Sequence, residues 1–156
     1  MHITIVAVGQ KLPAWAQTAV DDYLARFPRD FTVTVKEVKA EARTGGKPVA
    51  QVMAAEAERI ERAVPAGDIL VAMDEHGRDM TTVDFAKKIS GWKNEGCGVT
   101  FIIGGADGLD PALKAKSRMM LRLSSMTLPH AFARVLLTEQ IYRAWSILAN
   151  HPYHRV

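Results

Sequence analysis

Short apolar runs alternate along the chain with segments whose apolar residues recur at helical spacing. Residues 2–8 (HITIVAV) and 98–103 (GVTFII) are runs rich in β-branched residues, typical of strands buried on both faces. Residues 68–73 (DILVAM) show the same pattern, and 119–123 (MMLRL) form a shorter candidate strand. Residues 31–38 instead alternate apolar and polar positions, which predicts a half-exposed strand near a sheet edge.

Helical spacing of apolar residues fills most of the intervals between these strands. It predicts helices over residues 13–27, 49–64 and 131–150. A further helix should begin at Thr81, because Asp84 three residues later gives a capping-box pattern. Alternation of short strands with helices predicts the α/β class.

The predicted fold is one α/β domain over residues 1–156, with a mainly parallel sheet of five to six strands and helices on both faces. The length suits a single domain, and the sequence contains no internal repeat, low-complexity tract or linker. Apolar residues make up 48% and charged residues 24% of the chain, which is typical of a globular protein and not of a disordered one.

The remaining totals exclude several classes of protein. A single cysteine, Cys97, leaves no internal disulfide framework and no cysteine-rich zinc site. No apolar run approaches the ~20 residues of a membrane helix, and residues 1–8 lack the basic start of a signal peptide. We therefore expect a cytoplasmic protein. The net charge of +3 is compatible with a nucleic-acid partner without requiring one.

Ligands of open parallel sheets bind beyond the carboxyl ends of the strands, here after Met73, Ile103 and Leu123. The second of these ends runs into a turn with three glycines in five residues, followed by Asp110 and Pro111, which together mark a helix start. Glycine there allows either a tight strand-to-helix turn or the close approach of a flat ligand. The phosphate-binding patterns GxGxxG and GxxxxGK[ST] are absent from the sequence.

Residues 123–130 (LSSMTLPH) form a second candidate site, since this connection has hydroxyl and backbone groups but little charge. It is either an ordinary loop before the last helix or a segment packed against a ligand. The last helix is apolar around most of its circumference, which predicts a partner subunit as part of its cover. Its narrow polar stripe consists of Glu139, Arg143, Ser146 and Asn150.

The tail after this helix carries aromatic and basic side chains in the pattern HPYHR. Such a tail either frays or contacts nucleic acid, because aromatic rings stack on unpaired bases and arginine pairs with phosphate. No carboxylate or cysteine cluster accompanies His151 and His154, so we expect no metal site. Arg143 can also form an i,i+4 ion pair with Glu139.

Several stretches together resemble the RlmH family, the bacterial SPOUT-class enzymes that methylate N3 of a pseudouridine in large-subunit ribosomal RNA. The stretches span the whole chain and are VAVG (6–9), YLARFP (23–28), IGGADG (103–108), LSSMTLPH (123–130), YRAW (142–145) and NHPYHR (150–155). The resemblance implies a C-terminal trefoil knot, which topology alone argues against. It also implies a homodimer with the active site at the interface, and the ribosome or its RNA as substrate.

The resemblance further implies a binding site for S-adenosylmethionine. Its contacts would be Met73, Gly104, Leu123, Ser124, Ser125, Met126, Thr127 and Leu128. For the charge that develops as the N3 proton leaves, we expect Arg143, Tyr153 and His154 to act, with His154 assisting proton loss. Two alternatives stay open: a nucleotide-using α/β enzyme, and a ribosome- or RNA-binding module without catalysis.

Overall fold

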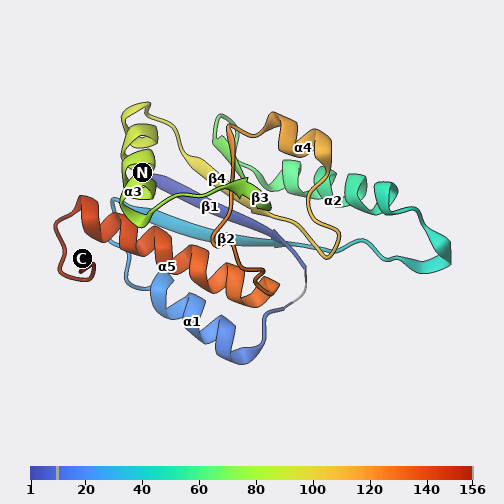
Figure 1. Cartoon of the computed structure of the whole chain (residues 1–156), viewed down its shortest axis with the longest axis horizontal. Helices are drawn as coiled ribbons and strands as arrows, with labels where there is room; N and C mark the ends of the chain where they lie inside the picture. Colours follow the sequence, from blue (N-terminus) through green and yellow to red (C-terminus); the bar gives the residue numbers. More distant parts are fainter. Residues whose placement is uncertain (10, 156) are drawn as a thin grey trace.

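Five strands, all parallel, form the central sheet of the chain in the order β2-β1-β4-β3-β5 (Figure 1). The computed structural model describes residues 1–9 and 11–155. The strands are β1 (His2–Val8), β2 (Thr32–Val38), β3 (Ile69–Arg78), β4 (Val99–Ile103) and β5 (Met119–Leu121). The predicted α/β class is therefore confirmed, with a sheet that is entirely parallel within the described residues.

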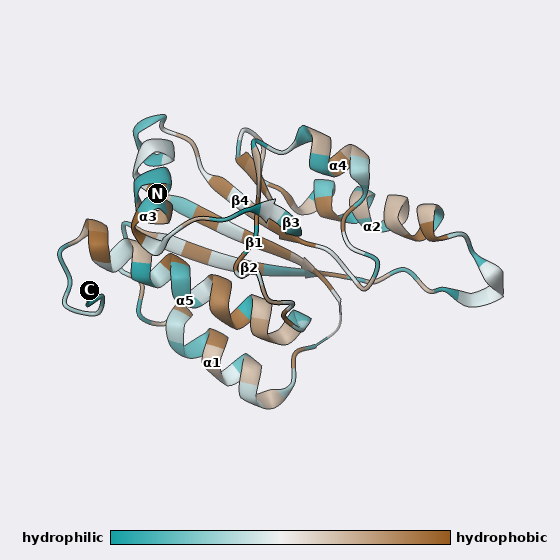
Figure 2. Cartoon of the chain, viewed as in Figure 1, coloured by the Kyte–Doolittle hydropathy of each residue, from teal (hydrophilic) through white to brown (hydrophobic). Residues whose placement is uncertain are grey.

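Burial along the strands follows the sequence patterns that predicted them. Every residue of β4 is buried, as are Ile3 to Val8 in β1, because both strands lie in the middle of the sheet and helices cover both faces. Exposure alternates along β2, which forms one edge of the sheet as its apolar–polar alternation predicts. The hydropathy colouring shows the same contrast between the central strands and the outer helix faces (Figure 2).

Helices cover both faces of the sheet, as predicted. On one face lie α1 (Ala14–Leu24), α3 (Thr82–Asn94) and α5 (His130–Leu148). Apolar residues of α3 and α5 pack on Ile3, Ile5 and Phe101, and those of α1 pack against Val35 of β2 and the start of α5. The other face carries α2 (Val49–Ala63) and α4 (Pro111–Lys116), which pack on Val6, Val8 and Ile102. A 3-10 turn, η1 (Thr44–Gly46), lies between β2 and α2.

The predicted helix starts rest on side-chain caps. The Thr81 hydroxyl accepts from the Asp84 amide at 3.1 Å ahead of α3, and the Asp110 carboxylate accepts from the Ala112 amide at 2.8 Å ahead of α4. Helix α5 ends at Leu148, two residues before the predicted end. Asn150 has a φ of 54°, a left-handed conformation that turns the chain away from the helix axis.

Strand β3 differs from the prediction of a strand over 68–73 followed by a loop. It continues to Arg78, and both Met73 and Arg78 pair with Leu121 of β5 around a register shift. A Cβ on Gly77 would meet backbone atoms of Leu121 and Met120 at 2.7 to 2.9 Å, so only glycine allows this crossing. A period-2 pattern cannot reveal such an irregularity, because the bulge interrupts the alternation.

Strand β5 ends at Leu121, two residues earlier than predicted, because the chain leaves the sheet into the connection to α5. The C-terminal trefoil knot stays a prediction. Among the described residues, no helix combines the length and apolar character needed to cross a lipid bilayer.

Candidate cofactor cleft and C-terminal cluster

A cleft lies beyond the carboxyl ends of β3 and β4, where the sheet topology directs attention. Its larger part has a volume of about 530 Å³ and lies between the end of β3, the glycine turn after β4 and the start of α5. A smaller part, of about 140 Å³, continues along the connection after β5. Met73, Ile103 and Leu128 line both parts, so we treat them as one cleft.

Seven of the eight residues predicted to contact the cofactor line this cleft. Met73 and Leu128 line both parts, and Gly104 lines the larger one. The others, which line the smaller part, are Leu123, Ser124, Met126 and Thr127. The predicted contact Ser125 does not appear among the lining residues. Residues that are 50 positions apart in the sequence are thus brought together by the parallel strands.

The glycine turn after β4 packs backbone against backbone. A Cβ on Gly104 would lie 2.6 Å from the carbonyl carbon of Gly108 and 2.8 Å from the Leu109 nitrogen. Gly105 and Gly108 form an isolated bridge, and Gly108 has a φ of 84°. The tight-turn interpretation is therefore correct for this segment, and the same turn forms a wall of the cleft. The other interpretation, close approach of a flat ligand to this turn, stays a prediction.

Two ion pairs connect neighbouring elements at the edge of the cleft. Lys114 Nζ donates to Asp74 Oδ2 at 2.9 Å, and the His76 amide donates to Asp74 Oδ1 at 2.8 Å. Burial raises the pKa of Asp74, but these two hydrogen bonds outweigh it, and the pKa lies below its usual value. Asp74 therefore stays ionised and joins the end of β3 to α4. Arg43, after β2, forms an ion pair at 2.5 Å with Asp107 of the glycine turn.

The connection before α5 supplies backbone groups and small side chains to the cleft. Ser124 Oγ accepts from the Met126 amide at 2.9 Å, which fixes a turn at this point. The side chain of Met126 is 77% exposed at the rim. Ser125, Met126 and Thr127 are exposed, so this segment is a surface loop that also lines the smaller part of the cleft.

The three predicted catalytic residues lie together at the other end of α5. Arg143 Nε donates to Glu139 Oε1 at 2.8 Å, and the Tyr153 hydroxyl donates to the same oxygen at 2.9 Å. Tyr23 of α1 bonds the Tyr153 hydroxyl at 2.9 Å. Arg143 lies over the Tyr153 ring and contacts His154 Nδ1 at 3.4 Å. We call these five residues the C-terminal cluster.

The contacts within the C-terminal cluster decide where its side chains carry their protons. Burial and the hydrogen bonds with Tyr23 and Glu139 raise the pKa of Tyr153 far above its usual range, so the hydroxyl stays protonated. Burial lowers the pKa of Arg143, but Glu139 outweighs this and raises it. A guanidinium can only donate, so His154 Nδ1 accepts and the neutral ring carries its proton on Nε2. That Nε2 is buried and has no partner within the described residues.

Sequence analysis missed part of this cluster. Glu139 was assigned only a surface pair with Arg143, and Tyr23 was noted in a matching stretch without a role. The helical spacing of Glu139 and Arg143 was visible, but the approach of α1 and the tail depends on tertiary packing. Arg26 also stacks on the Tyr23 ring at 4.7 Å, which adds a cation to the aromatic group.

The cleft and the C-terminal cluster lie far apart within one chain. Arg143 comes thirteen residues after His130 on α5, and a rise of ~1.5 Å per residue separates them by about 20 Å. The C-terminal tail lies at the end of the molecule where β1 begins, whereas α5 starts at the opposite end (Figure 1). The cleft is lined by residues from the start of α5 and from the turn after β4. The structure therefore brings the expected cofactor contacts together in the cleft and the expected catalytic residues together in the C-terminal cluster. Within one chain, these two groups of residues stay apart.

The exposed side of α5 joins these two regions. Leu136 and Phe132 are 36% and 48% exposed, and Phe132 packs on Trp15 of α1, which is 50% exposed. The predicted polar stripe is only partly correct, because Ser146 is fully buried and Asn150 lies beyond the helix. Most of the apolar circumference is covered by α1, α3 and the sheet, which leaves a limited apolar patch of Trp15, Phe132 and Leu136.

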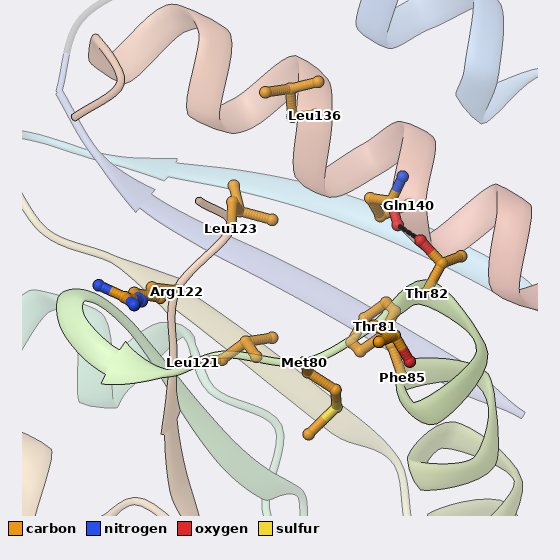
Figure 3. A pocket seen from close by; sticks show the side chains of 9 residues that line it. All are labelled: Met80, Thr81, Thr82, Phe85, Leu121, Arg122, Leu123, Leu136 and Gln140. Carbon is orange, nitrogen blue, oxygen red and sulfur yellow. Dashed lines mark hydrogen bonds between the residues drawn. The ribbon is translucent and has the colours of Figure 1, made fainter. Parts of the chain in front are cut away.

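A further pocket of about 200 Å³ lies beside this patch, between α3, α5 and the end of β5. Figure 3 shows Leu136 and Leu123 on one side and Phe85 on the other, with Thr82 Oγ1 donating to Gln140 Oε1 at 2.8 Å. Leu123 lines both this pocket and the cleft. Within residues 1–9 and 11–155, no cluster of three or more histidine, cysteine or acidic residues is placed to hold a metal ion.

Comparison with known proteins gives a consistent result. The sequence model of the family described as "Predicted SPOUT methyltransferase" matches residues 1–154. A protein of Ralstonia pickettii named "Ribosomal RNA large subunit methyltransferase H" is 54% identical over 156 residues, covering 100% of both chains. A protein of Bordetella avium with the same name is 54% identical over 155 residues, covering 99% of each.

Solved structures share the fold at low sequence identity. A probable methylase family protein from Haemophilus influenzae superposes with a TM-score of 0.59 at 14% identity, covering 99% of this chain and 70% of the other. The SpoU methyltransferase AviRb from Streptomyces viridochromogenes gives a TM-score of 0.50 at 15% identity, covering 96% and 61%. These likenesses concern the fold alone.

Proposed function

The chain belongs to the SPOUT methyltransferase family, and on this premise we propose that it transfers a methyl group from S-adenosylmethionine to N3 of a pseudouridine in large-subunit ribosomal RNA. The relatives that are 54% identical carry the name of a large-subunit ribosomal RNA methyltransferase. The observation that carries the proposal is the cleft, because seven of the eight residues expected to contact the cofactor converge on it.

The cleft suits S-adenosylmethionine in size and chemistry. Pockets for ligands of this size measure ~300–1,000 Å³, and the larger part of the cleft alone reaches about 530 Å³. Apolar side chains of Met73, Ile103 and Leu128 offer a surface for a flat ring. The glycine turn and the Leu123–Leu128 segment add backbone groups for hydrogen bonds. The phosphate-binding patterns GxGxxG and GxxxxGK[ST] are absent from the sequence, which counts against a nucleotide-using enzyme.

Catalysis of this kind needs position and charge stabilisation from the protein. When bound, S-adenosylmethionine supplies an already activated methyl group, so the protein needs only to align donor and acceptor, which is worth ~7–11 kcal/mol at best. The N3 proton must leave the base, and charge then accumulates on the base oxygens. Arg143 and the Nε2–H of His154 are donors that can stabilise this charge.

In the arrangement described, Tyr153 contributes as stacking surface and His154 as a donor. The Tyr153 proton is committed to Glu139, and the His154 nitrogen that faces Arg143 is already an acceptor. The expected help of His154 in proton loss therefore stays a prediction that requires a different tautomer from the one favoured here. The partly exposed rings of Tyr23 and Tyr153 offer a surface on which a base can stack, and the buried Tyr142 packs against both.

A homodimer is part of the proposal, because one chain separates its cleft from its C-terminal cluster. Two copies related by a two-fold axis that passes near Leu136 would pack α5 antiparallel to its equivalent. The cluster at the end of one α5 then approaches the cleft at the start of the other. The exposed apolar patch of Trp15, Phe132 and Leu136 is available for such an interface.

The alternative of a ribosome- or RNA-binding module without catalysis fits the tail but leaves the cleft unexplained. Simple binding of RNA needs no second, partly apolar cleft at the strand ends. Titration calorimetry with S-adenosylmethionine and S-adenosylhomocysteine separates the two functions. We expect saturable binding of both compounds to the wild-type protein and methyl transfer to ribosomes that lack the modification.

The Leu128→Glu variant locates the binding, because it places a carboxylate inside the cleft. We expect its affinity for S-adenosylhomocysteine to fall by at least about 100-fold, since a charge would be buried without a partner. Val83→Glu, an equivalent change at an exposed apolar residue of α3, serves as the matched control. Equal affinities of Leu128→Glu and wild type would show that the cleft does not hold the cofactor.

A further inference from the structure

A chain of polar groups centred on the buried Arg134 leads from the sheet edge to the glycine turn of the cleft. Arg134 on α5 is only 2% exposed, and its Nη1 donates to Glu37 Oε2 of β2 at 2.6 Å. Its Nε donates to His130 Nε2 at 3.0 Å. The His130 ring contacts the backbone of Gly104, and this contact favours the protonated ring, as a carbonyl acceptor does.

The protonation state of His130 follows from these partners. Arginine can only donate, so His130 Nε2 must be without a proton to accept from Arg134. The neutral ring therefore carries its proton on Nδ1, which is the nitrogen left to face Gly104. Burial, followed by the positive charge of Arg134, lowers the pKa of His130, while Glu37 and the Gly104 backbone oppose this shift. The ring is consequently neutral at physiological pH.

His130 is placed where its state matters for the cleft. It is the first residue of α5, directly after the Leu123–Leu128 segment, and its side chain lines the larger part of the cleft. Gly104 also lines that part. One imidazole thus joins two segments that are expected to contact the cofactor, and Arg134 fixes the orientation of the ring.

We propose that His130 is a positioning residue for the cofactor, whose neutral ring, oriented by Arg134, holds the Gly104 backbone in its binding geometry. The inference rests on the proposed cofactor site. Protonation would place an N–H of His130 against the Arg134 guanidinium and release the ring from its position. Cofactor affinity should therefore fall in mildly acidic solution while the wild-type fold is retained.

Other titratable groups near this site are identified by their positions. Glu37 and Arg134 face the ring from β2 and α5, and each is joined to the chain of hydrogen bonds that reaches it. Around the cleft, Asp74 is paired with Lys114, and the exposed His76 lies beside Asp74. His76 is the other group that can titrate near neutral pH, so it needs its own control.

Replacing His130 by asparagine or by glutamine tests its two hydrogen bonds one at a time, because each variant keeps one bond and loses the other. His130→Asn places an amide near the position of Nδ1 and can still donate to Gly104, but it leaves Arg134 Nε without an acceptor. His130→Gln places its amide near the position of Nε2, so it can accept from Arg134 but cannot reach Gly104 in the same way. Arg134 Nη2 already has no partner within the described residues, so a second loss on this side chain should reduce stability.

The experiment measures the dissociation constant of S-adenosylhomocysteine and the thermal midpoint for each protein. At roughly pH 7.5 we expect His130→Gln to bind about tenfold more weakly than wild type, with an unchanged midpoint, because a hydrogen bond at the cleft is lost. His130→Asn should bind within about threefold of wild type but melt about 3–6 °C lower. A residue with only a structural role would change both quantities together.

The pH series tests the protonation step. Wild-type affinity should fall by at least about fivefold between roughly pH 7.5 and 5.5, whereas His130→Asn should lose this dependence. His76→Asn is the control and should retain the dependence. Parallel losses of affinity and stability in both His130 variants, or an unaltered pH series in His130→Asn, would overturn the inference. Absence of binding to the wild-type protein would instead show that the proposed cofactor site is wrong, and the inference would fail with it.

Discussion

The cleft and the C-terminal cluster differ in the groups from which they are built. The cleft consists mainly of backbone and small or apolar side chains, and its shape depends on the absence of a Cβ at Gly104. The cluster consists of charged and aromatic side chains that hold one another, with Glu139 Oε1 accepting from both Arg143 and Tyr153. Loops at the strand ends thus form the concave surface of the cleft, while α5 and the tail provide hydrogen-bond donors.

This difference suggests a division of labour between the two regions. A cofactor that serves many reactions binds in a concave, mostly apolar site. A specific base in RNA is recognised by oriented hydrogen-bond donors and by aromatic rings on which it stacks. Because α5 places about 20 Å between the two regions, the proposed second copy of the chain would bring them together. Variants in either region, and a mixture of two such variants, test this division of labour.

The largest effect is expected from Arg143→Ala. Loss of a charged donor that acts in the transition state reduces kcat by ~10²–10³-fold. The affinity for S-adenosylhomocysteine should not change, since Arg143 does not line the cleft. The measurement is methyl transfer to unmodified ribosomes beside calorimetry. Arg118→Ala removes another ion-paired arginine, the partner of Glu95, and should retain full activity.

Mixing Arg143→Ala with Leu128→Glu tests whether the two regions act across subunits. Random exchange makes half of the dimers mixed, and each of these has one intact composite site, so about a quarter of wild-type activity should return. If cleft and cluster act within one chain, the mixture should stay inactive.

Leu136→Arg should dissociate the proposed dimer, and its effect on activity should be the next largest. A charge in the middle of an apolar interface costs several kcal/mol when it has no partner, so the dimer should dissociate. Sedimentation velocity would report the change in mass, and activity should fall by at least about tenfold with little change in cofactor affinity. Val83→Arg is the matched control at an exposed apolar residue of α3. Full activity of monomeric Leu136→Arg would contradict the composite site.

Gly104→Ala should show that the cleft depends on its backbone. A Cβ there would lie 2.6 Å from a backbone carbon of Gly108, and such overpacking reduces the free energy of unfolding by about 1–3 kcal/mol. Chemical denaturation measures the loss. Gly91→Ala, in α3 with open space around it, should instead stabilise the protein by about 0.5–1 kcal/mol. If both variants unfold like wild type, the turn is looser than described.

Tyr153→Phe should have the smallest effect. It removes the hydrogen bonds to Glu139 and Tyr23 but keeps the ring, so kcat should fall by only about three- to tenfold. The raised pKa of Tyr153 keeps the hydroxyl protonated, so the pH–rate profile between roughly pH 7 and 9 should keep its shape in the variant. A lost alkaline limb in Tyr153→Phe would identify the phenolate as a base.

The sequence by itself determined the α/β class, the central strands and the helix starts, because these depend on local periodicity and on caps such as Thr81 and Asp110. It also located the cleft, since parallel strands place their carboxyl ends at one edge and three such ends could be read directly. The resemblance supplied the identity of the cofactor and the prediction of the catalytic residues, which local patterns could not provide.

Only the tertiary structure decided the remaining features. The crossing at Gly77, the contact of Tyr23 with Tyr153 and the chain from Glu37 through Arg134 to His130 join residues that are distant in sequence. Such contacts leave no periodic signal, because they depend on how completed elements pack. The separation of the cleft from the C-terminal cluster is likewise a consequence of the length and placement of α5.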